Sequence, residues 1–129
     1  MKLENGKSEF LFAGAYNPLW IIRKDTVDIE EIKGDKQPIG KFRNASPFKT
    51  HKTFVQPGDT IYVFTDGYAD QFGGKKNKKF KTVNLARLLV SIQEKEMFQQ
   101  RQILESQFDE WKGTFEQIDD VCIVGLRIV

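Results

Sequence analysis

The sequence predicts an α+β domain in which a mainly antiparallel β-sheet or sandwich is flanked by two helices. Three observations predict this class. Short strand patterns separated by turn residues come first, two amphipathic helical patterns follow, and a continuous apolar run ends the chain. The 129 residues suit one domain, and the sequence contains neither an internal repeat nor a low-complexity segment.

The first strand pattern follows Asn5-Gly6, a dipeptide typical of the type I′ turn of a hairpin. Residues 8–15 are predicted to form the strand after this turn, whereas the arm before it is very short. We therefore expect a hairpin cut close to its start, with the natural protein continuing upstream. Residues 19–24 and 26–33 are predicted to be two further strands joined by a tight turn, because apolar residues in the second alternate with acids.

The middle of the chain combines a long loop with two more strand patterns. Residues 34–48 contain two Gly and two Pro and are predicted to be a loop. Residues 50–55 and 60–64 are predicted to be strands, and the turn residues Pro57-Gly58-Asp59 separate them. We expect these two strands to form a hairpin with a glycine-containing loop.

Two helices are predicted next. In the first, apolar residues recur at i, i+3, i+4 and i+7, and Thr82 or Asn84 could cap its start. The second is predicted over residues 97–112, with Gly113 standing where a helix C-terminus favours glycine. The apolar stripes consist of Leu85, Leu88, Leu89 and Ile92 in the first helix and of Ile103, Leu104, Phe108 and Trp111 in the second.

The last strand contains the only cysteine. Residues 121–129 (VCIVGLRIV) favour a buried central strand, in which Cys122 would pack as a small apolar residue. The chain also has a single histidine, His51, so neither a Cys/His zinc site nor a multi-histidine site can be assembled. Any chemistry that this chain performs is therefore expected to use oxygen ligands.

The charge of the chain argues against whole-surface binding to nucleic acid. Lys and Arg total 20 against 18 Asp and Glu, a net charge of +2. No apolar run approaches the roughly 18 residues that span a bilayer, and the start does not resemble a signal peptide. We expect a soluble, cytoplasmic chain with no nucleic-acid or membrane partner, although other domains could anchor the parent protein.

Carboxylates stand at the ends of two apolar strand patterns. Asp66-Gly67 directly follows TIYVF, and Asp119-Asp120 directly precedes VCIVGLRIV. Adjacent acids repel each other unless a cation or hydrogen-bond donors offset the repulsion, and carboxylates suit hard ions such as Mg²⁺ or Mn²⁺. Each pair alone is also consistent with an ordinary turn or a capped loop, so the pairs decide little without a wider pattern.

Three blocks supply that pattern. Residues 12–23 (FAGAYNPLWIIR), 57–67 (PGDTIYVFTDG) and 119–127 (DDVCIVGLR) resemble, in order and spacing, the bacterial SpoIIE-like branch of the PPM (2C-type) metal-dependent serine/threonine phosphatases. The resemblance implies a PPM-like fold and hydrolysis of phosphoserine or phosphothreonine in a phosphorylated protein. It covers nearly the whole chain, and its TDG and DD blocks are specific in combination.

The resemblance also implies roles for single residues. Asp66 is similar to the metal-ligating Asp of the TDG block, with Gly67 as its turn partner. Asp119 is similar to the ligand of the closing block, and Asp120 would support it, although the sequence leaves open which of the two coordinates. In this family, two divalent ions (Mn²⁺ or Mg²⁺) and a bridging water carry out the hydrolysis.

One block of the family is missing. The bridging Asp of the family lies upstream, in a Gly-Asp block followed by a Gly-His-Gly-like stretch. The Gly-Asp pairs of this chain, Gly34-Asp35 and Gly58-Asp59, lie in other segments. We therefore expect residues 1–129 to be the C-terminal part of the phosphatase domain, with an incomplete metal site and little activity alone.

Two surface features complete the sequence prediction. A basic run follows Gly73-Gly74 and could steer a phosphorylated protein towards the metal site, or could simply be a solvated loop. Apolar surface normally covered by a missing half could make this chain dimerise. The basic run contains Lys75, Lys76, Lys78 and Lys79.

Two other classes of function are compatible with the sequence. A non-catalytic scaffold or protein-binding domain would keep the PPM fold without a complete metal site, and the sequence upstream of Met1 would distinguish it from an enzyme. A β-rich module for carbohydrate or nucleic acid is less consistent, because the charge is near neutral and no aromatic residues interleave the lysines.

Overall fold

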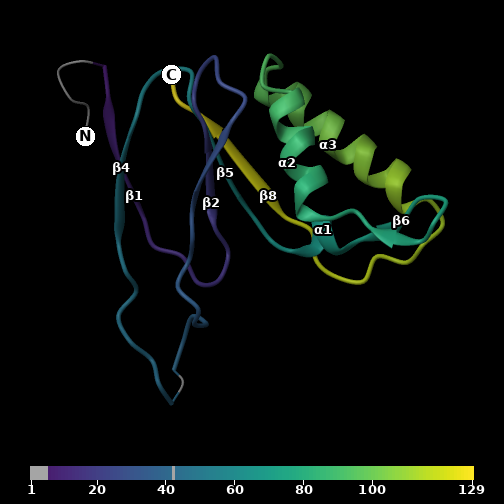
Figure 1. The fold of residues 1–129 in the computed structure, drawn as a ribbon, viewed down its shortest axis with the longest axis horizontal. Helices are drawn as coiled ribbons and strands as arrows, with labels where there is room; N and C mark the ends of the chain where they lie inside the picture. The colour runs from purple at the N-terminus through teal and green to yellow at the C-terminus, as the bar shows by residue number, and fades with distance from the viewer. Residues whose placement is uncertain (1–5, 42) are drawn as a thin grey trace. The chain divides into compact units, whose positions relative to one another are not determined.

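The computed structural model describes residues 6–41 and 43–129, which form two compact units (Figure 1). Unit 1 contains the described residues up to Val63 together with Gly125–Val129, and unit 2 is Phe64–Val124. The α+β class with antiparallel pairing is confirmed, and three short elements between residues 67 and 79 were not predicted. Asn5 of the predicted first turn lies outside the described residues.

The strands assemble into small sheets. One sheet has the order β1-β4 and another the order β3-β2-β5-β8. Pairing is antiparallel between β1 and β4, between β2 and β3, and between β2 and β5. The strands of these sheets are β1 (Ser8–Phe12), β2 (Leu19–Ile22), β3 (Ile29–Ile32), β4 (His51–Val55), β5 (Thr60–Phe64) and β8 (Ile123–Arg127).

The core of unit 1 follows the period of two in these strands. Leu19 lies opposite Val63, and Ile21 lies opposite Ile61, so one face of the β2-β5 pair is lined by large aliphatic side chains. Val55 at the end of β4 packs into the same cluster. Partly buried side chains complete it, namely Phe10, Phe12, Ile32, Val63 and Ile128.

The predicted hairpin of β4 and β5 is wrong. The two strands belong to different sheets, since β4 pairs with β1 and β5 pairs with β2. The turn that joins them passes through Gly58 at a φ of 95°, a left-handed conformation that favours glycine. The backbone N–H of Gln56 donates to the carboxylate of Asp59 at 2.9 Å. This N–H is therefore paired with a side chain rather than with the backbone of a neighbouring hairpin strand.

Asp59 is buried and is the centre of an ionic network in unit 1. Its side chain also accepts hydrogen bonds from the backbone N–H of Lys24 at 2.9 Å and from the guanidinium of Arg23 at 3.1 Å. Burial alone would raise the pKa of Asp59, but these hydrogen bonds and the positive charge of Arg23 outweigh it and lower the pKa. The network ties the β2-β3 turn to the connection between the two sheets.

Unit 2 contains the helices. The predicted second helix is confirmed in full as α3 (Met97–Lys112), with Gly113 as its C-cap. The first is observed as α2 (Thr82–Ser91), which contains Leu85, Leu88 and Leu89 of the predicted stripe and has Ile92 as its C-cap. The predicted N-cap of α2 is wrong, because Lys81 precedes the helix and Asn84 donates to the carbonyl of Phe80 at 2.7 Å. The remaining elements are α1 (Gly67–Asp70), β6 (Phe72–Gly73) and β7 (Lys78–Lys79). No helix among the described residues is both long and apolar enough to cross a membrane.

The prediction that the last strand is central and buried is also wrong. β8 lies at the end of the four-stranded order, and along it Val124 is 55% exposed and Leu126 is 51% exposed. Cys122, just before the strand, is exposed as well. An apolar run reports which residues avoid water but not which neighbouring elements are present to cover them.

Replacing Asp59 by Asn tests the ionic network. Asp59→Asn removes the buried charge among the two acids, Asp59 and Glu30, that pair with Arg23, so we expect a loss of about 2–4 kcal/mol in the free energy of unfolding. Because the folded pKa of Asp59 lies below the ordinary value of 3.8, this stabilisation is complete above that pH and is lost as the pH falls through the folded pKa. Chemical denaturation between neutral pH and acid measures both effects.

Asp28→Asn is the matched control, because Asp28 is an exposed acid in the same unit. It should leave the unfolding free energy within about 0.5 kcal/mol of the starting chain. Equal effects of the two substitutions would contradict a special role for Asp59.

Candidate metal site

The first predicted metal segment lies where β5 ends and α1 begins. Asp66 is the N-cap of α1, with φ −71° and ψ −15°, and its side chain makes no capping hydrogen bond. The backbone N–H of Asp70 donates to the carbonyl of Asp66 at 2.9 Å, which closes the single turn of this helix. The carboxylate of Asp66 is exposed and makes no hydrogen bond to the helix that it precedes.

The second predicted segment is held against the first through Thr65. The hydroxyl of Thr65 donates to the carbonyl of Asp120 at 3.0 Å and accepts from the backbone N–H of Cys122 at 3.1 Å. The backbone N–H of Thr65 donates in turn to the carbonyl of Cys122 at 3.0 Å. Three hydrogen bonds thus fix the residues beside Asp66 to those around Asp120, which are 55 positions away from Thr65 in the sequence.

Gly67 makes this approach possible. A Cβ atom built on Gly67 would lie 2.1 Å from the carbonyl oxygen of Asp120, a distance that real Cβ atoms do not show. Gly67 lies within α1 and is not among the residues with positive φ, so the sharp turn expected from the sequence does not explain it. The space left by the missing side chain is occupied by the backbone of Asp120.

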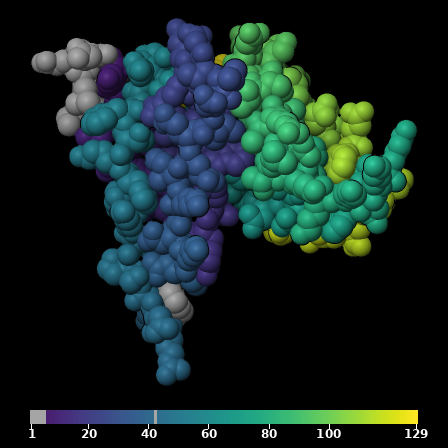
Figure 2. All heavy atoms as spheres, in the orientation of Figure 1, coloured from purple at the N-terminus to yellow at the C-terminus, as the bar shows by residue number. Residues whose placement is uncertain are grey.

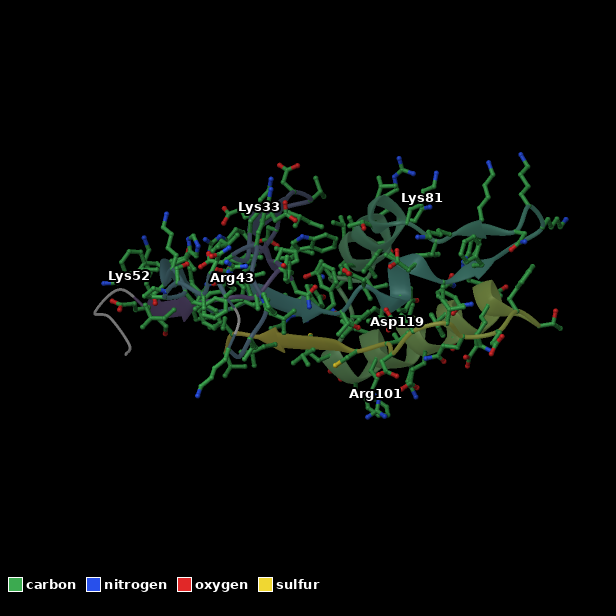
Figure 3. All side chains as sticks on the ribbon, turned by 90° about the horizontal axis from the view of Figure 1, so that it is seen from below. Lys33, Arg43, Lys52, Lys81, Arg101 and Asp119 are labelled. Atoms are coloured by element: carbon green, nitrogen blue, oxygen red, sulfur yellow. The ribbon has the colours of Figure 1, made fainter. Side chains whose placement is uncertain are left out.

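The acidic side chains of the second segment are exposed. The carboxylate of Asp119, labelled in Figure 3, accepts the backbone N–H of Asp120 at 2.7 Å. The side chain of Gln117 donates to the carbonyl of Asp119 at 3.0 Å, so the loop before β8 is organised by local hydrogen bonds. These bonds leave carboxylate oxygen atoms of Asp119 and Asp120 available to a ligand.

The side chains of Asp66, Asp119 and Asp120 have the oxygen atoms that a hard divalent cation prefers, but they are not gathered into a complete set of ligands. Carboxylate oxygen atoms are the ligands that Mg²⁺ and Mn²⁺ prefer. Nevertheless, within residues 6–41 and 43–129 there is no group of three or more His, Cys, Asp or Glu side chains placed to hold a metal ion. The described part of the chain therefore supplies two candidate ligand segments rather than a complete cage.

Tyr68, which the sequence reading missed, anchors α1. Its hydroxyl donates to the carbonyl of Leu104 in α3 at 2.8 Å in a buried environment. Burial, together with the negative charge of Asp109, raises the pKa of Tyr68. Its ring also packs against Phe80 and Phe108, with centroids 5.3 and 5.0 Å apart. The available signal was the large aromatic residue directly after Asp66-Gly67, where a solvent-exposed turn would not need one.

The predicted basic run lies beside the same helix. Lys75, Lys76, Lys78 and Lys79 are all exposed, and the ammonium group of Lys79 is 3.6 Å from the carboxylate of Asp70. The structure thus joins the lysines to α1, which begins immediately after Asp66.

The sequence of the chain matches a known protein family. The family model of Stage II sporulation protein E (SpoIIE) matches residues 1–129. The chain belongs to the SpoIIE family. No curated protein matches it.

Two solved structures share the SpoIIE-family fold. The SiaA-PP2C domain of Pseudomonas aeruginosa is 27% identical with a TM-score of 0.83, and the match covers 94% of this chain and 47% of that one. The PP2C phosphatase domain of SpoIIE from Bacillus subtilis, solved with a fragment of its regulatory domain, is 18% identical with a TM-score of 0.66. That match covers 98% of this chain and 35% of the other. The chain therefore spans about half or less of the structures it matches.

The contact between Gly67 and Asp120 predicts that alanine at position 67 destabilises the chain. In a free helix, Gly→Ala stabilises by about 1 kcal/mol. At Gly67 the added methyl group collides with backbone, so we expect Gly67→Ala to destabilise the chain by about 1–3 kcal/mol. Thermal unfolding followed by circular dichroism measures the change.

Ser106→Ala, at an exposed position in α3, is the control for helix propensity and should not destabilise. A stabilising Gly67→Ala substitution would show that the backbone of Asp120 does not lie against α1.

Proposed function

We propose that this chain is part of a metal-dependent phosphatase that hydrolyses phosphoserine or phosphothreonine in a bacterial signalling protein, such as an anti-sigma-factor antagonist. Membership of the SpoIIE family supports the reaction class. The observation that carries the proposal is that the two acidic segments are held against each other. The hydroxyl of Thr65 donates to the carbonyl of Asp120, and Gly67 has no side chain that would collide with that carbonyl. Such an approach brings carboxylates from both segments to one region of unit 2.

In this proposal Asp66 and Asp119 would ligate Mn²⁺ or Mg²⁺, Gly67 would shape the segment, and Asp120 would hold the second segment in place. The unused capping capacity of Asp66 and the exposure of both carboxylates support these roles. The ions would supply a water of lowered pKa that attacks phosphorus, so no nucleophilic side chain is needed. The scarcity of His and Cys in the chain agrees with such chemistry.

We further propose that the remaining ligands come from a part of the catalytic domain outside this chain. The chain covers 47% of the SiaA-PP2C domain structure, and its described residues hold no complete metal cage. Alone, the chain should then bind Mn²⁺ poorly and hydrolyse little. The alternative is a scaffold or protein-binding domain, which would bind a protein without turnover even in the full-length parent.

The function is tested by substitution in the full-length parent protein. Asp66→Asn and Asp119→Asn each remove a charged ligand, so we expect at least about a 100-fold loss of Mn²⁺-dependent phosphatase activity on a phosphoserine protein. Chelation of the metal should abolish activity in the starting protein. Release of inorganic phosphate is the measurement.

Glu110→Gln, at an exposed acid on α3, serves as the control and should retain full activity. Full activity of both Asp variants would refute the metal assignment. A parent protein that is folded but inactive under all metal conditions would favour the scaffold.

We also propose that this chain associates with a second copy when it is produced alone. The exposed Val124 and Leu126 on an edge strand support this, because an open apolar edge can pair with another strand. Leu126→Lys should shift sedimentation towards the monomer. Val27→Lys, at a position 76% exposed, should not. A monomer at the highest soluble concentration of the unsubstituted chain would contradict the proposal.

A further inference from the structure

The two short strands β6 and β7 form a basic hairpin, which we define as residues 72–79. Phe72 pairs with Lys79 and Gly73 pairs with Lys78, so the turn between them carries Lys75 and Lys76. No acidic residue occurs from position 71 to position 81. In the space-filling view of Figure 2, the teal atoms of this part of the chain extend outward at the right-hand edge.

The basic hairpin is built into unit 2. The backbone N–H of Gly74 donates to the carbonyl of Trp111 at 3.1 Å, and a Cβ atom on Gly73 would lie 1.9 Å from that same oxygen. Gly74 has a φ of 70°, which favours glycine, and a Cβ atom there would lie 2.8 Å from the Trp111 ring. Both positions therefore favour glycine where the hairpin lies against the end of α3. Below it, the ring of Phe80 packs edge-on against Trp111, with centroids 5.5 Å apart. Because the backbone of the basic hairpin is held in this way, a partner that binds its side chains pays less conformational entropy for ordering the loop.

Most of the positive charge on the basic hairpin is not neutralised. Lys79 pairs with Asp70 and also lies 5.9 Å from the centre of the Phe72 ring. In the part of the chain that the structure describes, no ion pair involves Lys75, Lys76 or Lys78. Since the whole chain has a net charge of only +2, this is a local concentration of charge on a nearly neutral protein.

We propose that the basic hairpin docks an acidic segment of the phosphorylated protein on which the parent enzyme acts. The link to the reaction rests on the proposed function, whereas the binding itself does not. Asp70 connects the two, because its carboxylate meets Lys79 while its backbone N–H bonds to the carbonyl of Asp66. A segment bound by the lysines is thereby held next to the helix that positions Asp66.

The chemistry of the hairpin favours an acidic protein over nucleic acid or a membrane. Proteins that bind single-stranded nucleic acid present aromatic rings on which bases stack, but Phe80 is packed among Tyr68 and Trp111. A net charge of only +2 argues against a broad basic surface for duplex binding. A hairpin that inserts into a membrane would carry apolar side chains at its tip, whereas the turn from Gly74 to Asn77 contains only glycine, lysine and asparagine. Lysines bind carboxylate and phosphate groups as flexible point charges, which suits an irregular acidic segment.

The test measures binding rather than turnover. The probe is a fluorescent synthetic peptide in which a phosphoserine is followed by a run of glutamates, titrated with the 129-residue chain at low ionic strength. Replacing Lys75, Lys76 and Lys78 together by Gln should weaken binding at least about five-fold. Added salt should weaken binding of the unsubstituted chain in the same direction.

The matched control replaces three exposed lysines of unit 1, Lys33, Lys36 and Lys41, by Gln, which changes the net charge equally. Equal weakening in both triple variants would overturn the proposal, because it would indicate a general effect of charge. Tighter binding of vesicles rich in anionic lipid, or of single-stranded DNA, than of the peptide would also overturn it.

This outcome is separable from that of the proposed function. Asp66→Asn should lower turnover in the parent by at least about 100-fold, while the isolated chain with the same substitution still binds the peptide. Loss of activity with intact hairpin binding supports both proposals, whereas an inactive starting parent with intact binding would remove only the enzymatic one.

Discussion

The carbonyl of Asp120 lies where a side chain on Gly67 would otherwise be, and Thr65 bonds to the same carbonyl. This contact joins the end of β5 to the approach of β8, two segments that meet only through folding. Because it is made by backbone and by one hydroxyl group, it leaves the neighbouring carboxylates free for other partners. The placement of both acidic segments and the start of α1 depend on this one approach.

Hydrogen bonds to residues of α3 support the segments on one side of that contact. Tyr68 fastens α1 to the carbonyl of Leu104, and Trp111 holds the basic hairpin through its carbonyl and donates its indole N–H to the carbonyl of Gln71 at 2.8 Å. Thus α3 supports both α1 and the hairpin that follows it. Tyr68, two residues after Asp66, is thus the residue through which α3 contacts the Asp66 segment.

The local features were predictable from the sequence, whereas the choice of partners was not. The second helix was predicted from residue 97 to residue 112 as observed, because its apolar spacing and Gly113 act within one element. The strand patterns of β4 and β5 were also correct, but their pairing was not, since pairing depends on β1 and β2 far away in the chain. The apolar run of β8 likewise did not reveal its exposed edge position.

The same division applies to the candidate site. Asp66 and Asp119 could be selected because their segments stand at strand ends and match a family pattern. The reason for Gly67 could not be found, because it is a contact with a backbone more than fifty residues away. Asp59 was recognised as part of a sequence block, yet its buried position between Arg23 and two backbone N–H groups emerges only from the fold.

The exposed position of Cys122 has a practical consequence. It is the only thiol in the chain, and it stands two residues after Asp120, with its backbone bonded on both sides to Thr65. A fluorophore or spin label attached there would occupy a single known place on unit 2 without replacing any carboxylate. A label at Cys122 would therefore report structural changes around Thr65 and Asp120, where the two acidic segments are held together.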